Sequence, residues 1–393
     1  MSVSPATGPA TEVQTLLLVD DDAETCAGLG ELLYRDGRHL IICRDLESAQ
    51  IAIEHYAVTD VLTDVKLSGA FRFEGLEIID FLRRRASNAR VMIMTGQLTD
   101  ELDREARRRG AIAALQKPFS VDDLEDVIGA PIGDTPGLLT IIPTLDDILD
   151  DLDSLVPVYQ PLVWTETPQH AVGFEALTRL QSSSPFANPE VLFRYAHMKG
   201  RILDLELAAA SRSLSLGRDL AQIGFVSINL HPHTFADADR LCDGVMNAAA
   251  EAAVSPERLV LEITEQSSLP DLALVEAIAA TLRTHGVRFA FDDVGSAYSH
   301  LSAIAVVRPA YLKISQHFGT ACEADPVHRK IVENVESLAR SFASEVVLEG
   351  IETEQTATFA RDLGIRFGQG FYYSRPASAD RVLERYRSVS RSN

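Results

Sequence analysis

Short apolar runs that end in acidic, amide or basic side chains recur along this chain, and helical patterns separate them. Strands that alternate with helices build parallel sheets, because a parallel connection needs a crossover and a helix supplies one. The pattern therefore predicts an α/β fold throughout. At about 100–200 residues per domain, the 393 residues favour two domains, or three.

The balance of residue types excludes several classes of protein. Hydrophobic residues make up 46% and charged residues 24%, which excludes collagen-like and disordered chains. The longest apolar runs fall short of the roughly 18 residues that a membrane-spanning helix needs. The polar N-terminus lacks the basic and apolar regions of a signal peptide. We therefore expect a soluble, cytoplasmic protein that does not bind membranes.

The net charge argues against nucleic-acid binding, and the cysteine pattern argues against disulfides and zinc. The net charge of −21 repels phosphate backbones, so we expect no role in binding DNA. A small phosphate ligand stays compatible, because bound cations can invert the local sign. The four cysteines form no CxxC pair, which argues against a disulfide scaffold or a zinc site and favours plain buried thiols.

Composition shifts divide the chain into four parts. Residues 1–15 are predicted to be a flexible leader, 16–130 a first domain, 131–155 a linker and 156–393 a second domain. The linker ends in a short acidic amphipathic helix with Thr144 as its N-cap. This helix either packs on its own domain, the interpretation we favour, or serves self-association or signalling. The arginines at 83–85, 104 and 107–109 indicate solvated helix ends or, less simply, a docking surface for the acidic linker.

Four strand ends in the first domain carry polar side chains. The first predicted strand ends in Asp20 and Asp21, the third in Asp64, the fourth in Thr95 and the fifth in Lys117. In an open α/β sheet, sites form beyond the carboxyl ends of the strands. These carboxylates, hydroxyl and lysine could together hold Mg²⁺ and a phosphoryl group.

In this order and spacing, residues 16–130 resemble the receiver domain of two-component response regulators. The resemblance implies a doubly wound parallel sheet and a phosphoryl group accepted by Asp64 from a histidine kinase. It implies that Asp20 and Asp21 hold one Mg²⁺ with Asp64 and the Lys66 carbonyl, and that Thr95 and Lys117 act as the switch. One departure is Ala114, which stands where the family usually has an aromatic switch residue.

Seven predicted strands of the second domain also end in polar residues. Its length of about 235 residues is near that of a TIM-type barrel, which gathers the carboxyl ends of its strands on one face. So many carboxylates cannot all stay ionised without compensation, and hard divalent cations are their natural partners. The strand ends are Glu175, Asn229, Glu262, Asp292 with Asp293, Lys313, Glu349 and Gln369.

The segments VYQP, GFEALTR, INL, LEITE, DDVGSAYSHL, LKIS, LEGIE and QGFYYSRP make the second domain similar to the EAL family of cyclic di-GMP phosphodiesterases. The resemblance implies a TIM-barrel-like fold and hydrolysis of cyclic di-GMP to linear pGpG with two Mg²⁺ or Mn²⁺ ions. It also implies homodimers or higher homo-oligomers. The order of receiver and barrel motivates a further hypothesis, that phosphorylation of Asp64 controls the activity of the barrel.

Residue roles follow from the same resemblance. Glu175, Asn229, Glu262 and Asp292 would bind one metal, and Asp292, Asp293 and Glu349 would serve the other. Lys313 would position water, Glu349 is the candidate base, and Glu265 would steady the loop from Asp292 to Leu301. The residues expected to meet substrate or support the site are Gln160, Leu177, Arg179 and Gln369.

Two departures keep an alternative open. Ser315 stands in place of a family aspartate, and the loop after Asp292 has an unusual sequence. The alternative is a catalytically weak or inactive receptor that binds cyclic di-GMP and signals through a partner. An unrelated barrel enzyme is disfavoured, because the chain has no P-loop, no GxGxxG and no GxSxG motif.

Overall fold

The structure is a computed structural model, and it describes residues 13–67, 73–131, 135–264, 271–295, 301–321 and 325–390. The chain forms two compact units. The first unit comprises Met1–Asp150 and Gln181–Gly200, and the second comprises Asp151–Leu180 and Arg201–Asn393. The segment 181–200 therefore packs with the first unit, although along the chain it interrupts the second.

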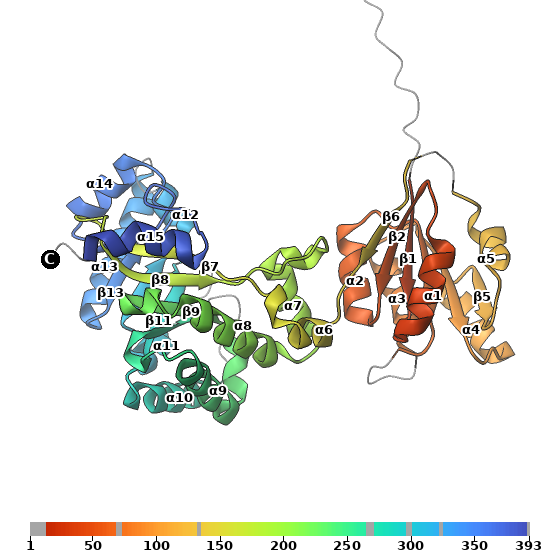
Figure 1. Cartoon of the computed structure of the whole chain (residues 1–393), viewed down its shortest axis with the longest axis horizontal. Helices are drawn as coiled ribbons and strands as arrows, with labels where there is room; N and C mark the ends of the chain where they lie inside the picture. The colour runs from red at the N-terminus through yellow and green to blue at the C-terminus, as the bar shows by residue number, and fades with distance from the viewer. Residues whose placement is uncertain are drawn as a thin grey trace, which may run out of the picture. The chain divides into compact units, whose positions relative to one another are not determined.

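The first unit is a six-stranded parallel sheet with helices on both faces, as Figure 1 shows. The strand order is β5-β4-β3-β1-β2-β6. Helices α1 and α5 share one apolar core with the sheet, and α2 and α3 pack on the other side. The elements are β1 (Gln14–Val19), α1 (Ala23–Leu33), β2 (Arg38–Cys43), α2 (Leu46–His55), β3 (Asp60–Asp64), α3 (Glu74–Arg84), β4 (Arg90–Thr95), α4 (Asp100–Arg109), β5 (Ala113–Gln116), α5 (Val121–Ile128), β6 (Leu138–Ile141), α6 (Leu145–Asp150) and α7 (Pro189–Met198).

Strand β6 is an element that sequence analysis placed in a linker. Its four residues lie between Pro136 and Pro143, a setting that is typical of irregular chain. It pairs in parallel with β2, and the Ile142 amide continues the ladder by donating to the Ile42 carbonyl. The linker therefore extends the receiver sheet by one strand.

The predicted acidic helix is α6, and it packs on its own unit. Thr144 and Asp147 exchange side-chain and backbone hydrogen bonds at its start, and Leu145 and Ile148 are buried. In the part of the chain that the structure describes, Arg107 pairs with Asp103 of the same helix, and Arg109 pairs with Glu105 of its own helix and with Asp80 of α3. The linker carboxylate of Asp147 pairs with Arg44.

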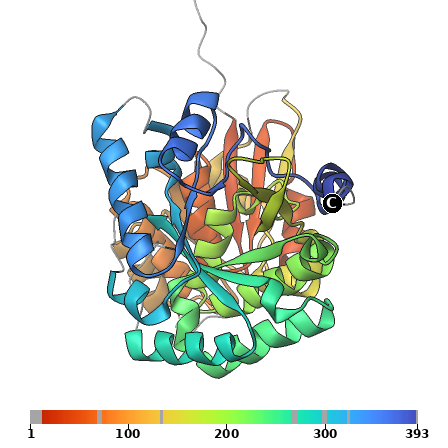
Figure 2. The same ribbon diagram turned by 90° about the vertical axis from the view of Figure 1, so that its left-hand side faces the viewer.

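The second unit is a closed eight-stranded barrel with helices outside it (Figure 2). The strand order is β10-β11-β12-β13-β14-β7-β8-β9, and β7 runs antiparallel to both of its neighbours. No described helix is long and apolar enough to cross a bilayer. The elements are β7 (Val158–Trp164), β8 (Ala171–Leu177), α8 (Ile202–Gly217), β9 (Phe225–Leu230), α9 (Ala238–Glu251), β10 (Leu259–Ile263), α10 (Leu272–Thr284), β11 (Arg288–Val294), α11 (Leu301–Val307), β12 (Tyr311–Ile314), α12 (Gln316–Ala321), α13 (Pro326–Ser341), β13 (Glu345–Leu348), α14 (Glu354–Asp362), β14 (Phe367–Gly368) and α15 (Ala379–Ser390).

An apolar cluster formed by the barrel strands positions the polar residues beyond it. The cluster contains Val260, Ala290, Tyr311, Val347 and Phe367. Side chains two residues apart on a strand share a face. Each cluster member is therefore followed, two residues later, by a polar residue on the same face: Glu262, Asp292, Lys313, Glu349 and Gln369. The apolar layer closes the barrel beneath these polar groups.

Candidate active site

Lys313 lies at the centre of the polar residues at the carboxyl ends of the barrel strands. Its side chain is 1% exposed. The ammonium nitrogen lies 3.0 Å from a Glu175 oxygen, 2.6 Å from Glu262, 3.3 Å from Asp292 and 2.9 Å from Glu349. Burial alone would lower the pKa of Lys313, but the surrounding carboxylates, Asp292 first, raise it well above its ordinary value. Lys313 is therefore a fixed positive charge.

Glu175 on β8 is held by donors from three other strands. Besides Lys313, it accepts hydrogen bonds from the Asn229 amide at 3.1 Å and from the Gln369 amide at 2.8 Å. Burial favours the neutral acid, but Lys313 and these donors keep the pKa of Glu175 below its ordinary value. Glu175 is thus an ionised carboxylate in a buried position.

The neighbouring acids have pKa values above their ordinary values, in contrast to Glu175. Burial raises the pKa of Glu262 to about 8. Burial also raises the pKa values of Asp292 and Glu349, and the mutual repulsion of the carboxylates adds to this effect. Full ionisation of the group would place more negative charge around Lys313 than one lysine can neutralise, and added cations would relieve this repulsion.

A bulge in β11 brings two consecutive acids into the site. Successive side chains of a regular strand point to opposite faces. The pairing of β11 with β12 shifts register between Phe291 and Val294, and Asp293 adopts a positive φ of 54°. As a result, Asp292 and Asp293 both lie near Glu349.

The described carboxylates form two groups that share one residue. Ligand oxygens of Glu175, Glu262 and Asp292 lie within 4.8 Å of one another, and so do those of Asp292, Asp293 and Glu349. Hard oxygen ligands of this kind suit Mg²⁺ or Mn²⁺. Each group offers carboxylate oxygens of the kind that a divalent cation would need.

The residues expected to meet substrate differ in what they contact: Gln369 bonds to a site carboxylate, whereas Gln160 and Arg179 bond to backbone carbonyls. Because β7 is antiparallel, Gln160 near its start lies opposite Glu175 in the β7–β8 pair, and its amide donates to the Ser374 carbonyl. Arg179 is partly buried and donates to the Thr178 carbonyl, while Leu177 ends β8. Gln369 contacts Glu175. Glu265 lies outside the described residues.

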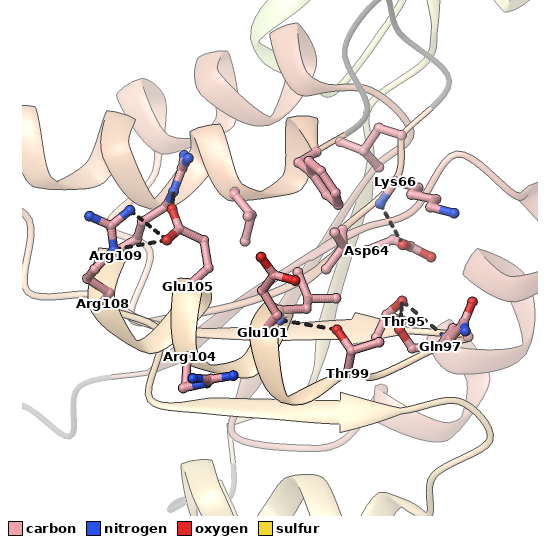
Figure 3. Close-up of a pocket in the computed structure, with 16 residues that line it drawn as sticks. Asp64, Lys66, Thr95, Gln97, Thr99, Glu101, Arg104, Glu105, Arg108 and Arg109 are labelled. Atoms are coloured by element: carbon pink, nitrogen blue, oxygen red, sulfur yellow. Dashed lines mark hydrogen bonds and ion pairs between the residues drawn. The ribbon is translucent and has the colours of Figure 1, made fainter.

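The receiver residues converge at the carboxyl end of their own sheet. Lys117 makes ion pairs with both Asp20 and Asp64, and the Lys66 amide donates to Asp64 at 2.8 Å. Burial raises the pKa of Asp20 despite the lysine. Asp64, Lys66 and Thr95 line one end of a groove of about 1410 Å³ that continues along α4, as Figure 3 shows. Asp21 is exposed beside Asp20.

Two glycines that sequence analysis did not single out touch these sites through their backbones. A Cβ atom on Gly75 of α3 would lie 1.8 Å from the Asp64 carbonyl oxygen. A Cβ atom on Gly319 of α12 would lie 1.7 Å from the Glu349 carbonyl oxygen. Each helix thus approaches the backbone carbonyl of a site residue at a distance that only glycine permits. No pattern in the sequence marks these contacts, because each glycine meets a backbone that lies outside its own helix.

Comparison with known families finds two domain models in this chain. The EAL domain model matches residues 145–376, and the response regulator receiver domain model matches residues 16–129. The cyclic di-GMP phosphodiesterase RocR of Pseudomonas aeruginosa is 23% identical over 393 residues, which cover 95% of this chain and 98% of RocR.

Other relatives match one part of the chain. The bifunctional diguanylate cyclase/cyclic di-GMP phosphodiesterase MucR of Pseudomonas aeruginosa is 31% identical over 58% of this chain, which spans only 34% of MucR. A solved structure of the PaMucR phosphodiesterase in complex with c-di-GMP is 28% identical, with a TM-score of 0.54, and covers 60% of this chain and 97% of that one.

An EAL domain protein from Listeria monocytogenes shares the fold, with a TM-score of 0.52 and 23% identity over 63% of this chain and 98% of that one. The matched EAL model covers more than half of the residues, and the barrel carries its acidic strand ends on one face. The chain therefore belongs to the EAL domain family and carries a response regulator receiver domain before the EAL domain.

Proposed function

We propose that this chain hydrolyses cyclic di-GMP to linear pGpG with two divalent cations, under control of phosphorylation at Asp64. The observation that carries the proposal is the pair of acidic groups that share Asp292 around the buried Lys313. RocR and MucR, which are named as cyclic di-GMP phosphodiesterases, support the substrate.

The charge of the site fits two such cations. Five carboxylates (Glu175, Glu262, Asp292, Asp293 and Glu349) and one ammonium group (Lys313) leave four negative charges when all are ionised. Two divalent cations would balance them. Glu175, Asn229, Glu262 and Asp292 would hold one, and Asp292, Asp293 and Glu349 the other. When bound, Mg²⁺ or Mn²⁺ supplies Lewis acidity to water and to phosphoryl oxygens.

The protein's own groups supply orientation and proton transfer. Lys313 stays protonated, so its role is to orient the attacking water and to stabilise negative charge rather than to act as a base. Glu349, with a carboxylate oxygen 2.9 Å from the Lys313 ammonium nitrogen, is the candidate base that would accept the proton of the attacking water. Glu265 would steady the loop that follows Asp292. We assign substrate contacts to Gln160, Leu177 and Arg179, and substrate contact or support of Glu175 to Gln369.

The deciding experiment is chromatography of purified protein after incubation with cyclic di-GMP and Mg²⁺. We expect wild type to produce pGpG and Glu349→Ala to produce none, because that variant lacks the base and a cation ligand. Equal product from both proteins would overturn the assignment of Glu349.

A receptor without turnover is the second candidate, and Ser315 favours it. Ser315 is buried after β12, and its carbonyl accepts the Phe318 and Gly319 amides at the start of α12. A hydroxyl there offers no carboxylate to a cation. Binding of cyclic di-GMP without cleavage, and cleavage restored by Ser315→Asp, would support the receptor.

Control through the receiver is supported by the contacts of Asp64 with Lys117 and the Lys66 amide. We assign one Mg²⁺ to Asp20, Asp21, Asp64 and the Lys66 carbonyl, with a histidine kinase as the phosphoryl donor. Beryllofluoride, a phosphoryl mimic, should change the turnover of wild type and leave Asp64→Asn unchanged. Equal responses of the two proteins would remove this control.

We also propose that the chain forms a homodimer or larger homo-oligomer. The edge strand β6 exposes Leu138, Leu139 and Ile141, which are 54%, 43% and 58% accessible. A free apolar strand edge favours association. Light scattering of the purified chain tests this proposal, and a monomer mass at micromolar concentration would contradict it.

A further inference from the structure

The segment 181–200 is held against the start of α2 and against α6 by buried polar contacts. Tyr195 of α7 is fully buried, stacks on Phe186, and donates its hydroxyl hydrogen to the Asp45 carboxylate. The same hydroxyl accepts the Leu145 amide of α6 at 3.2 Å. A buried hydroxyl with a charged partner is costly to separate, because both groups would lose their hydrogen bonds.

Ion pairs surround this contact. The Lys199 ammonium lies 3.2 Å from Glu47 and 3.6 Å from Asp45, and Arg194 pairs with Glu54 at the other end of α2. The lysine side chain is only 27% exposed, as is typical of a charge that is committed to its partners. Segment 181–200 therefore contacts both ends of α2.

The corner between β2 and α2 is connected to the phosphorylation site. Asp20, which pairs with Lys117 next to Asp64, donates its backbone amide to the Cys43 carbonyl at the end of β2. Two residues later Asp45 caps α2 by accepting the Ser48 amide, and it also accepts from Tyr195. A rearrangement around a phosphoryl group on Asp64 would thus act on a strand end that holds segment 181–200.

On its other side the segment continues into strands of the barrel. Only three residues separate the end of β8 from Gln181, and β8 carries Glu175. Val156 and Arg179 exchange backbone hydrogen bonds of 2.7 and 3.1 Å, and Leu155 bridges Leu180. The linker and segment 181–200 therefore leave the β7–β8 pair side by side.

We propose that segment 181–200, docked on the β2–α2 corner, transmits the state of the receiver to the β7–β8 pair that carries Gln160 and Glu175. The proposal deepens the proposed function, since it assumes that the receiver controls the barrel. Helix α4 is not part of this proposed route: Arg107 and Arg108 pair with Asp103 and Glu105 of the same helix, and Arg109 pairs with Asp80 of α3.

The first variant reverses one ion pair. Lys199→Glu places a carboxylate beside Asp45 and Glu47, and Glu47→Lys in the same chain restores opposite charges. The matched control is Arg107→Glu, which reverses the charge of a pair on α4. The second variant, Tyr195→Phe, keeps the ring and removes only the hydroxyl, so it tests the proposal even if Lys199→Glu unfolds.

Two readouts are taken with and without beryllofluoride on the full chain. The first is hydrogen exchange of peptides that cover residues 171–200. The second is the ratio of cyclic di-GMP turnover with and without beryllofluoride. We expect both responses in wild type and in Arg107→Glu. In Lys199→Glu and Tyr195→Phe we expect the turnover ratio to move towards one by about twofold to fivefold. The double variant should recover it.

The outcomes separate this proposal from the proposed function. In one outcome no protein cleaves cyclic di-GMP, but beryllofluoride changes hydrogen exchange at residues 171–200 in wild type and not in Lys199→Glu. The proposed hydrolysis is then wrong, and the proposed transmission through segment 181–200 is supported. In the other outcome turnover responds to beryllofluoride equally in wild type, Lys199→Glu and Tyr195→Phe. The proposed hydrolysis is then supported, and the proposed transmission through segment 181–200 is wrong. Exchange changes confined to α4 and β5 would also overturn it.

Discussion

Lys313 is the residue that makes so dense a group of carboxylates compatible with a folded barrel. Its ammonium group contacts four acids within 3.3 Å, and those contacts offset part of their mutual repulsion. Removing one partner of such a buried group leaves the others uncompensated, which is strongly destabilising. Substitutions in this site therefore change stability as well as chemistry, and each test needs a readout for both.

Gln369 can be assigned by comparing cation affinity with substrate affinity. Because its amide donates to Glu175, we expect Gln369→Ala to weaken Mn²⁺ binding by about 10- to 100-fold, as for other groups that orient a metal ligand. Glu175→Ala should weaken it further. Calorimetric titration with Mn²⁺ measures both. A raised KM for cyclic di-GMP with unchanged Mn²⁺ affinity would instead make Gln369 a substrate contact.

Glu206 on α8 should make stability depend on pH. Its carboxylate accepts the His231 amide at 2.6 Å, and burial raises the pKa of Glu206 to about 8 from an ordinary value of 4.5. Between pH 4.5 and about 8, Glu206 keeps its proton in the folded state and has lost it in the unfolded state. The contribution of this proton to the free energy of unfolding is therefore fully present below pH 4.5 and is lost as the pH rises through about 8.

Glu206→Gln removes this titration. Urea unfolding at a series of pH values between 4.5 and 8.5 should show a smaller decline in the free energy of unfolding for the variant than for wild type. Parallel pH profiles for the two proteins would contradict the assignment. The conservative amide keeps the size of the side chain and an acceptor for His231.

At the scale of elements, irregularities place the functional side chains. The β11 bulge turns Asp292 and Asp293 to one site, and the antiparallel direction of β7 places Gln160 opposite Glu175. A regular barrel of eight parallel strands would do neither. The close approach of α3 to β3 at Gly75 is another local feature that places a functional residue, Asp64.

Gly75→Ala and Gly28→Ala form a matched pair in the receiver. A Cβ on Gly75 would meet the Asp64 backbone, which cannot move aside, so we expect a loss of stability on the order of 1–3 kcal/mol. Gly28 lies in α1 with nothing within 4 Å of its Cβ position, so alanine there should stabilise by roughly 0.5–1 kcal/mol. Denaturant unfolding of both variants checks the prediction, and equal effects would refute it.

At the scale of the whole molecule, two compact units carry two separate ligand sites. A ligand that binds only the folded state stabilises it, by about 2.7 kcal/mol at 100 times its dissociation constant. We expect Mn²⁺ to raise the melting temperature of the barrel and beryllofluoride with Mg²⁺ to raise that of the receiver.

Asp64→Asn should lose the response to beryllofluoride and keep the response to Mn²⁺, and Glu175→Ala should do the reverse. Calorimetric scans of the two variants measure both responses. A single transition that every ligand shifts equally in both variants would show that the sites do not act on separate units.

The sequence by itself determined the elements that local pattern encodes. Alternating apolar runs gave the strands of both units, and the acids at their ends, such as Asp64 and Glu175, marked the two sites, because parallel strands place their carboxyl ends together. Thr144 was recognised as a helix start because an N-cap is a local contact.

Only the tertiary structure decided what depends on distant partners. Strand β6 forms because β2 offers it an open edge, and its four residues between prolines carry no signal of their own. Gly75 and Gly319 matter through the backbones of residues outside their own helices, and Tyr195 through Asp45, 150 residues before it. The docking of segment 181–200 on the receiver sheet is of this kind, because side-chain periodicity specifies a buried face but not which surface covers it.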